Sequence, residues 1–488
     1  MILSFPAALR GTSQTDPHVL IEEVPNPPPF ADLWSLVAAQ PGFSLLDADP
    51  WAVNHWQAAC FGYDPFLTFS AKGNEITISR RGECHRVTGD PFQHLQATLR
   101  QYSNLAPVED VPTAGAIGYF GYDLRHHLER LPARAVDDLR LPDCVIHFYD
   151  RLFWFEPAKR EMLITSTGLP LPPGVAREQR ALERLHEGRD LIAHARLTGG
   201  GRSPELSPIA APLDSNMSKA QYCQALDRVL DYIAAGDIYQ ANISQRFVTQ
   251  FGGDPWALYR RLQKRFPAPF GAYLHCGPFQ VLSNSPERFL LVEGNRISTC
   301  PIKGTRPRGM TVEDDARIIG SLRYDPKERA EHVMIVDLER NDLGRICRVG
   351  SVHVERFETI ETYHTLHHMV SIVAGTLEDG TDPIDCLRAT FPGGSITGAP
   401  KIRAMEIIDE VEPTPRGLYT GAIGFIGFSG GMELNIAIRT AVVTGGQIYF
   451  QTGGGIVADS SPAKEYDETL LKAETFFRTL GIGAGFGR

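Results

Sequence analysis

A lysine in a segment rich in glycine and proline is the first residue of this sequence that could do chemistry. Lys303 stands in the segment 301–309, which reads PIKGTRPRG. We predict a turn there, because glycine and proline favour turns. An amine held on a stiff turn among arginines can have its pKa lowered and become a nucleophile. For the segment taken alone, the alternative is a solvated lysine in a basic loop.

Acidic residues recur at helical spacing in two other segments. Glu328 and Glu331 share one face of a predicted helix with an apolar stripe. Glu465, Glu468 and Lys472 cluster on the polar face of another predicted helix, and such a face by itself indicates only exposure to solvent. If the two helices face each other across a cleft, the four acids form an oxygen-rich site for Mg²⁺. This ion usually takes one or two protein carboxylates together with water and substrate oxygens.

The composition is that of a globular protein. The chain has 488 residues, of which 43% are hydrophobic and 22% charged, so it can form one large fold or two to three domains. The net charge of -10 argues against broad binding to nucleic acid or anionic membranes. An anionic substrate must therefore be held by local cations.

Cysteine usage and hydropathy predict a cytoplasmic location. The eight cysteines are scattered without a C-x-x-C pair, which favours neither a zinc site nor a disulfide framework. The first residues lack the pattern of a signal peptide, and no apolar run approaches the roughly 20 residues of a membrane span.

Composition also suggests how the chain is organised. A segment rich in glycine, serine and proline, 201–216, is interpreted as a linker between an N-terminal region, 1–200, and a C-terminal region, 217–482. Strand-like runs exceed what alternating βαβ units would give. We therefore expect an α+β layered fold with antiparallel sheets.

Capping and turn signals predict the elements of the C-terminal region. The predicted helices begin at Ser218, Asp254, Asp325 and Ser461. The predicted strands cover 241–248, 270–275, 279–282, 421–428, 433–443 and 447–451.

Five ordered motifs resemble those of the chorismate-utilising enzymes. They are PIKGTRPRG at 301–309, EHVMIVDLERND at 331–342, FPGGSITGAPK at 391–401, GGGI at 453–456 and EYDE at 465–468. The resemblance is strong over 215–480 and weaker over 1–200, where it points to the N-terminal domain of anthranilate synthase component I. It implies two large, mainly antiparallel sheets packed as a sandwich with helices outside.

The resemblance assigns the metal site. It implies that Glu331 and Glu468 bind Mg²⁺, the expected cofactor. Glu328 and Glu465 match neighbouring acids that act mostly through water.

The resemblance also assigns catalytic roles to three residues. It makes Lys303 the nucleophile and Glu287 the general acid, which burial should keep protonated. It places His368 near the ring carboxylate of chorismate. Without the family, Glu287 would be interpreted as a partner for Arg288, and His368 as a core histidine with its hydrogen bonds satisfied.

Nine residues are expected to line the substrate. They are Gln240, Thr305, Thr397, Tyr419, Arg439, Gly453, Gly454, Gly455 and Lys472. The planar guanidinium of Arg439 suits a carboxylate, although a charge at a strand edge is the alternative. The glycines permit close approach of backbone N–H groups, although a turn would also explain them. Gln240 stands where isochorismate-forming members carry a lysine that activates water, and this argues against water addition.

Lys303 decides between branches of the family, since anthranilate synthase component I carries alanine in its place. The resemblance therefore implies that chorismate is aminated at C4 through a covalent lysine intermediate. The product is 4-amino-4-deoxychorismate, the precursor of p-aminobenzoate and folate.

The sequence also predicts a partner. It contains no G-x-C-x-G nucleophile motif of a class I glutamine amidotransferase, so a separate amidotransferase subunit is expected to supply ammonia. Two alternatives remain open, anthranilate synthase component I and a non-catalytic regulatory or binding subunit. The complete set of Lys303, Glu287, Glu331 and Glu468 argues against the second.

Overall fold

The computed structural model describes most of the chain. The described residues are 19–47, 59–80, 82–103, 105, 113–157, 159–199, 212–363 and 366–482. Residues 1–18, which include the segment without a signal-peptide pattern, and most of the predicted linker lie outside these ranges. No helix in the described part is long and apolar enough to cross a membrane.

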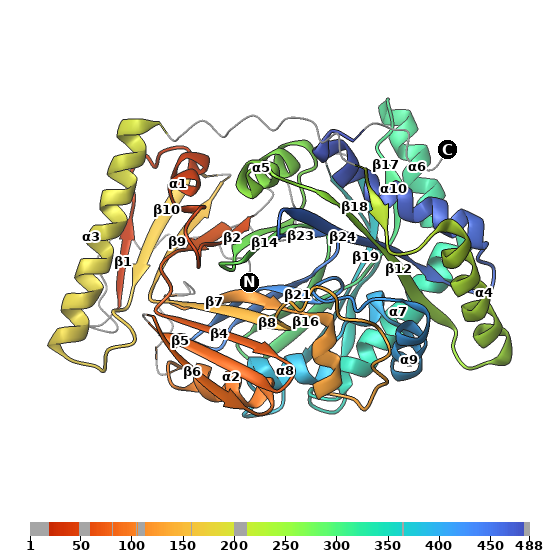
Figure 1. The fold of residues 1–488 in the computed structure, drawn as a ribbon, viewed down its shortest axis with the longest axis horizontal. Helices are drawn as coiled ribbons and strands as arrows, with labels where there is room; N and C mark the ends of the chain where they lie inside the picture. The colour runs from red at the N-terminus through yellow and green to blue at the C-terminus, as the bar shows by residue number, and fades with distance from the viewer. Residues whose placement is uncertain are drawn as a thin grey trace.

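Two twelve-stranded antiparallel sheets form the centre of the described part (Figure 1). In order, the first sheet contains β1 (Leu20–Glu23), β10 (Glu161–Ser166), β9 (Arg151–Glu156), β3 (Ala59–Gly62), β2 (Ser44–Asp47), β13 (Phe270–His275), β14 (Phe279–Ser285), β23 (Thr440–Thr444), β24 (Gln447–Ile456), β12 (Gln240–Gln250) and β11 (Asp214–Ser215), with β20 (Gly398–Ala399) on β12. The second contains β17 (Ile302–Pro307), β19 (Leu366–Thr376), β16 (Arg296–Cys300), β15 (Arg288–Glu293), β22 (Met432–Ile436), β21 (Ala422–Gly427), β7 (Gly115–Phe120), β8 (Cys144–Tyr149), β4 (Leu67–Lys72), β5 (Glu75–Arg80) and β6 (Glu83–Thr88), with β18 (His353–Thr362) on β19.

Helices cover the outer faces of both sheets (Figure 1). Those on the first sheet are α1 (Phe30–Val37), α3 (Val175–Thr198), α5 (Pro255–Arg265) and α10 (Pro462–Leu480). Those on the second are α2 (Pro91–Arg100), α7 (Pro326–Gly344) and α8 (Pro383–Thr390). The remaining helices are α4 (Lys219–Ala235) and α9 (Lys401–Val411) beside β12, α6 (Val312–Arg323) beside β17, and the short 3₁₀ helices Tyr122–His127 and Gly394–Ile396.

A separate apolar core fills the space between the sheets. Its buried residues include Leu46 and Trp154 from the first sheet and Ile117 and Ile423 from the second. The predicted α+β sandwich with antiparallel sheets and outer helices is therefore confirmed.

Strands from both sides of the predicted linker enter both sheets. In the first sheet β2 pairs with β13, and in the second β7 pairs with β21. The division of the chain into an N-terminal and a C-terminal region at the linker 201–216 therefore remains a prediction. The sheets and the core between them are continuous across it.

Local signals account for where the predicted helices begin. Ser218 and Gln221 form a capping box at the start of α4, and Gly236 ends the helix in a left-handed conformation. Asp254 and Asp325 cap α5 and α7, and each precedes a proline at the first helical position. The predicted helix starts are confirmed.

Two predictions of local structure are wrong. The segment expected to be one strand at 433–443 is two strands, β22 and β23, interrupted at Arg439, whose φ is 49°. The expected turn around Lys303 is the edge strand β17. Gly304 has a φ of 67°, and the pairing with β19 shifts register there, so the chain bulges and continues in the sheet.

Candidate active site

Lys303 lies on β17, and its amine is withdrawn from solvent. Burial lowers the pKa of Lys303, and Lys472 acts in the same direction while Glu331 opposes the shift. The predicted pKa shift is therefore confirmed, but the expected cause is wrong. Arg306 and Arg308 form ion pairs with acids of α6 and at the start of α7.

Glu287 lies in the connection between β14 and β15 and is 6% exposed. Burial raises its pKa from 4.5 to about 7, against opposing effects of Ser395 and Lys303. A carboxyl group with this pKa is partly protonated at neutral pH, as a general acid requires. Arg288 lies 3.8 Å from Glu433, so the alternative of a simple Glu287–Arg288 pair does not describe the site.

Ser395 is a site residue that the sequence analysis missed. Its hydroxyl donates a hydrogen bond to Oε1 of Glu287 over 2.7 Å. The residue lies in the 3₁₀ turn of the FPGGSITGAPK motif, where a hydroxyl among glycines was the available signal. Thr397 donates its own hydroxyl to the carbonyl of Gly393 over 2.9 Å, so this predicted substrate contact also braces the turn.

Gly455 brings two predicted site residues together. A Cβ at Gly455 would lie 2.6 Å from Nε2 of Gln240 and 3.6 Å from Nζ of Lys303. Gln240 is fully buried, and neither its Nε2 nor its Oε1 has a hydrogen-bond partner among the described residues. Because buried amides are normally satisfied, this pair of atoms indicates a place for water or for a polar ligand beside the lysine.

The glycine run lies in the interior of β24, so its interpretation as a turn is wrong. A Cβ at Gly454 would lie 3.3 Å from Oε2 of Glu465, and 3.9 Å from both Oε1 of Glu468 and Nζ of Lys472. Lys472 also donates a hydrogen bond to the carbonyl of Gly453 over 2.9 Å. The absence of side chains lets the polar face of α10 approach the strand.

The acid cluster consists of Glu328 and Glu331 on α7 with Glu465 and Glu468 on α10. Burial raises the pKa of Glu331, and the charges of Glu328 and Glu465 add to this effect. Burial acts against ionisation of Glu468, but Lys472 outweighs it and lowers the pKa. The two helices therefore bring their acids close enough to influence one another.

The acid cluster fits a cation that uses few protein ligands. Within the described ranges, no three His, Cys, Asp or Glu side chains converge tightly enough to hold a metal ion by themselves. Arg306 binds Glu328, Ser460 binds Glu465 and Lys472 binds Glu468. Glu331 has a more distant cation, Lys327, at 4.0 Å. This arrangement is compatible with Mg²⁺, which completes its shell with water and substrate oxygens.

Arg439 has the features of an anion-binding residue. No hydrogen bond or ion pair holds its guanidinium among the described residues, and burial lowers its pKa. Its positive φ places it in a backbone conformation that is uncommon for a side chain of this size. A strained and unpaired arginine is available for a carboxylate.

His368 and Thr305 lie on the strand pair that carries Lys303. They are register partners on β19 and β17, and the hydroxyl of Thr305 lies 2.8 Å from Nδ1 of His368. The histidine is thus both hydrogen-bonded, as a core residue would be, and located beside the predicted nucleophile.

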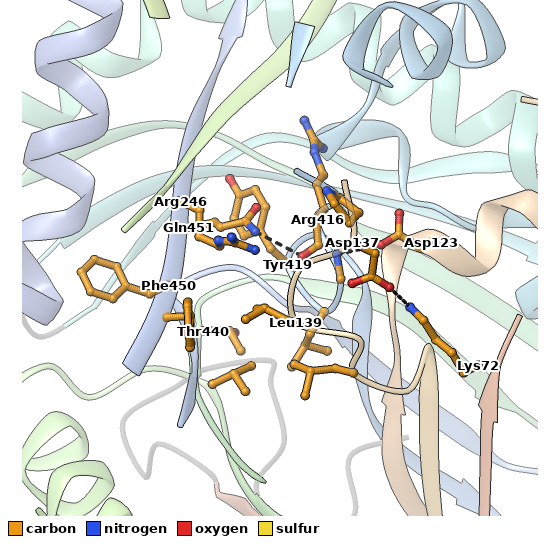
Figure 2. A pocket seen from close by; sticks show the side chains of 16 residues that line it. Lys72, Asp123, Asp137, Leu139, Arg246, Arg416, Tyr419, Thr440, Phe450 and Gln451 are labelled. Atoms are coloured by element: carbon orange, nitrogen blue, oxygen red, sulfur yellow. Dashed lines mark hydrogen bonds and ion pairs between the residues drawn. The ribbon is translucent and has the colours of Figure 1, made fainter. Parts of the chain in front are cut away.

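Tyr419 lines a separate pocket, together with Arg246, Arg416, Thr440 and Gln451 (Figure 2). Neither the predicted nucleophile nor the predicted general acid lines this pocket. Tyr419 itself is buried and precedes a threonine with a φ of 60°. The structure therefore places Tyr419 in the wall of this pocket and leaves its contact with substrate a prediction.

The chain matches the family described as chorismate binding enzyme over residues 51–478. It is 39% identical to aminodeoxychorismate synthase component 1 of Bacillus subtilis, covering 86% of this chain and 88% of that protein. It is 38% identical to anthranilate synthase component 1 of Bacillus caldotenax, covering 89% of this chain and 87% of that protein.

A solved structure shows the same fold. The anthranilate synthase component I of Streptococcus pneumoniae superposes with a TM-score of 0.74 at 29% identity. The match covers 96% of this chain and 95% of the other.

Proposed function

Since this chain belongs to the chorismate binding enzyme family, we propose that it aminates chorismate at C4, as an aminodeoxychorismate synthase component 1. The observation that carries the proposal is the reacting pair, Lys303 and Glu287. Burial lowers the pKa of the amine and raises that of the carboxyl group to about 7. Both groups are thereby shifted toward their uncharged forms. The uncharged amine can act as a nucleophile, and the uncharged carboxyl group can donate a proton.

The proposed reaction proceeds in two displacements. Nζ of Lys303 forms a bond to C2 of chorismate while the ring double bond shifts and the C4–O bond breaks. Glu287 gives its proton to the departing hydroxyl, which leaves as water. Ammonia then bonds to C4, the double bond shifts back, and the C2–N bond breaks to release Lys303. The proton lost by the new C4 amine returns to the Glu287 carboxylate.

Other residues hold the substrate in this proposal. Arg439 binds the enolpyruvyl carboxylate, because its guanidinium has no other partner in the described part of the chain. Glu331 and Glu468, with Glu328 and Glu465 acting through water, would hold Mg²⁺, whose charge would neutralise the ring carboxylate.

The ammonia is supplied by a second subunit. The relatives are named as component 1 of their synthases, and this sequence carries no glutaminase nucleophile motif. We therefore infer a glutamine amidotransferase partner and a cytoplasmic setting, in keeping with eight free cysteines. Free ammonium at high pH should replace the partner. Glutamine-dependent turnover by the purified chain alone would contradict this part of the proposal.

Product analysis tests the proposed function. The purified chain is mixed with chorismate, Mg²⁺ and an ammonium salt, and the products are followed by mass spectrometry and fluorescence. We expect 4-amino-4-deoxychorismate. The aromatic 2-aminobenzoate would instead identify an anthranilate synthase.

Anthranilate synthase is the second candidate because relatives with that name are nearly as similar to this chain. Lys303 argues against it. A reaction at C2 needs ammonia to occupy the position that the lysine takes in the C4 reaction. The regiochemistry of the product therefore distinguishes the two candidates.

A further inference from the structure

Glu339 is a buried acid of α7 with no place in the reaction described above. It lies two helical turns beyond Glu331 and is 3% exposed. Its Oε1 accepts a hydrogen bond from the backbone N–H of Gly394 over 3.2 Å. The side chain of Thr299, which is also buried, lies close enough to this carboxyl group to lower its pKa.

These two contacts connect the segments that carry the reacting pair. Gly394 precedes Ser395, whose hydroxyl donates to Glu287 over 2.7 Å. Thr299 lies near the end of β16, four residues before Lys303 on the next strand. One carboxyl group therefore links the turn behind the acid to the strand that leads to the nucleophile.

The turn is seated directly on α7. A Cβ at Gly394 would lie 2.6 Å from Cδ2 of Leu338 and 3.1 Å from Oε1 of Glu339. The backbone of the turn thus approaches the helix as closely as glycine permits. A small change at position 339 should move the turn and alter the geometry of the Ser395–Glu287 hydrogen bond.

The surroundings of Glu339 favour its neutral form. Burial raises its pKa to about 8, Asp342 and Glu287 add to this effect, and Lys401 opposes it. A neutral carboxyl group offers one O–H donor and one carbonyl acceptor. The side-chain amide of glutamine offers the same pair of functions in nearly the same shape, so Glu339→Gln is a conservative probe.

We propose that Glu339 is a positioning residue for the amination reaction. It holds the 393–396 turn in the place where Ser395 donates a hydrogen bond to Glu287, so that the acid is positioned to act together with Lys303. The inference rests on the proposed function, because it assigns Glu287 the role of general acid. Glu339 itself touches neither the reacting pair nor the substrate in this scheme.

The first test compares two variants at saturating ammonium and Mg²⁺, with rates measured as loss of chorismate. Glu339→Gln should keep kcat within about threefold, because its carbonyl can accept from Gly394. Glu339→Leu removes this acceptor and should lower kcat about fivefold to tenfold, no more than Ser395→Ala does, with a change in KM for chorismate below about threefold. Leu343→Ala is the matched control, since it removes packing from the same helix and no hydrogen bond. Equal kcat losses in Glu339→Leu and Leu343→Ala would overturn the proposal.

The second test measures coupling between Glu339 and Ser395. If Glu339 acts through Ser395, the double variant Glu339→Leu with Ser395→Ala should lose little more kcat than Ser395→Ala alone. Both single variants should also move the alkaline limb of kcat to higher pH, because the Ser395 hydrogen bond lowers the pKa of Glu287. Additive losses of kcat, or an unmoved limb in Glu339→Leu, would overturn the assignment.

Thr299→Val covers the case in which Glu339→Leu does not fold. It removes the Thr299 hydroxyl beside Glu339 and should lower kcat about threefold, with little change in KM, while Glu339→Gln stays active. Unchanged kcat in Thr299→Val would then reject the proposal. Because rates are read as chorismate loss, an anthranilate product from the wild type would refute the C4 reaction while the variants still decide the role of Glu339.

Discussion

The reacting pair and the acid cluster contain similar functional groups in different surroundings. Lys303 and Glu287 are shifted mainly by burial, which moves the amine and the acid toward their neutral forms. Glu468, in contrast, is kept ionised by Lys472, and its side chain is 49% exposed. Burial thus prepares groups that exchange bonds and protons, whereas neighbouring charge and partial exposure preserve carboxylates that can attract a cation.

The two regions also differ in what holds them in place. Glu287 is restrained by a hydrogen bond from Ser395, which lies in a turn 108 residues further along the chain. The acid cluster is carried by α7 and α10, whose positions depend on packing against different sheets. The reacting pair should therefore be sensitive to small changes in geometry, and the acid cluster to changes in charge. Four predictions test this difference.

Replacing Lys303 should have the largest effect. Lys303→Ala should lower C4 amination by about a thousandfold or more, because the nucleophile is lost. Chorismate binding should change little, since Arg439 and the acid cluster remain. Lys303→Arg should not rescue activity, because a guanidinium stays protonated. The measurements are product yield by mass spectrometry and chorismate affinity.

The contrary outcome for Lys303 is equally specific. If Lys303→Arg retains substantial 4-amino product, the residue supplies only positive charge and the covalent route is falsified. A chorismate-derived adduct trapped on the Lys303 peptide would support the covalent route directly.

Glu287→Gln should lower kcat by about 100- to 10,000-fold, the usual range for loss of a general acid. Wild-type kcat should fall as pH rises through about 7, because Glu287 then loses the proton that it must donate. The remaining activity of the variant should lack this limb. A full alkaline limb in Glu287→Gln would assign the ionisation to another group.

The same variant has a predictable effect on stability. The folded-state pKa of Glu287 lies above its unfolded value of 4.5, so the stability it contributes is present below pH 4.5 and is lost as pH rises through about 7. Glutamine does not ionise. The Tm of Glu287→Gln minus the Tm of wild type should therefore be larger at pH 8.5 than at pH 6. Thermal unfolding of both proteins at the two pH values measures this difference.

The acid cluster gives the third prediction. Glu331→Gln and Glu468→Gln should each lose most activity and need more Mg²⁺, because each removes a proposed ligand. From the sequence alone, both should keep or gain stability in metal-free buffer, since like charges repel. The structure separates them. Glu331 is crowded by other acids and should follow that expectation, whereas Glu468→Gln loses its pair with Lys472.

The size of that stability difference should be small. An ion pair this exposed contributes at most about 1 kcal/mol. Thermal unfolding without metal measures the difference, and Mg²⁺ titration of activity measures the ligand role. Near-normal activity of both variants at low Mg²⁺ would exclude the proposed metal site.

Ser395 should have the smallest effect of the four. Ser395→Ala removes one hydrogen bond, worth about 1 kcal/mol, and should lower kcat roughly fivefold to tenfold. The alkaline limb should move to higher pH, because the lost hydrogen bond favoured the ionised form of Glu287. Ser395→Thr is the control and should keep most of the activity. A limb that moves to lower pH would show that Ser395 stabilises the neutral acid instead.

Local rules were sufficient to predict where four of the helices begin. Capping residues such as Ser218 and Asp325, and the apolar stripes behind them, act over a few positions and mark where a helix begins and which face it buries. The sequence accordingly predicted that Glu465, Glu468 and Lys472 share one face of a helix. The count of strand-like runs also indicated antiparallel sheets.

Local rules failed where the sheet overrode them. Glycine and proline predicted a turn at Lys303, but pairing with β19 extends the segment and Gly304 absorbs the irregularity as a bulge. The strand expected at 433–443 is interrupted at Arg439. Strand pairing is decided by a partner far along the chain, so a window of neighbouring residues does not contain the information.

The sequence by itself determined which groups are available for chemistry, and the tertiary structure decided their state. Arginines adjacent to Lys303 in sequence turned out to pair with acids, and burial lowered the pKa of the lysine instead. Ser395 reaches Glu287 across 108 positions of sequence. Desolvation depends on all atoms around a group, most of which come from distant segments, so a pKa shift or a hydrogen bond of this kind exists only once the chain has folded.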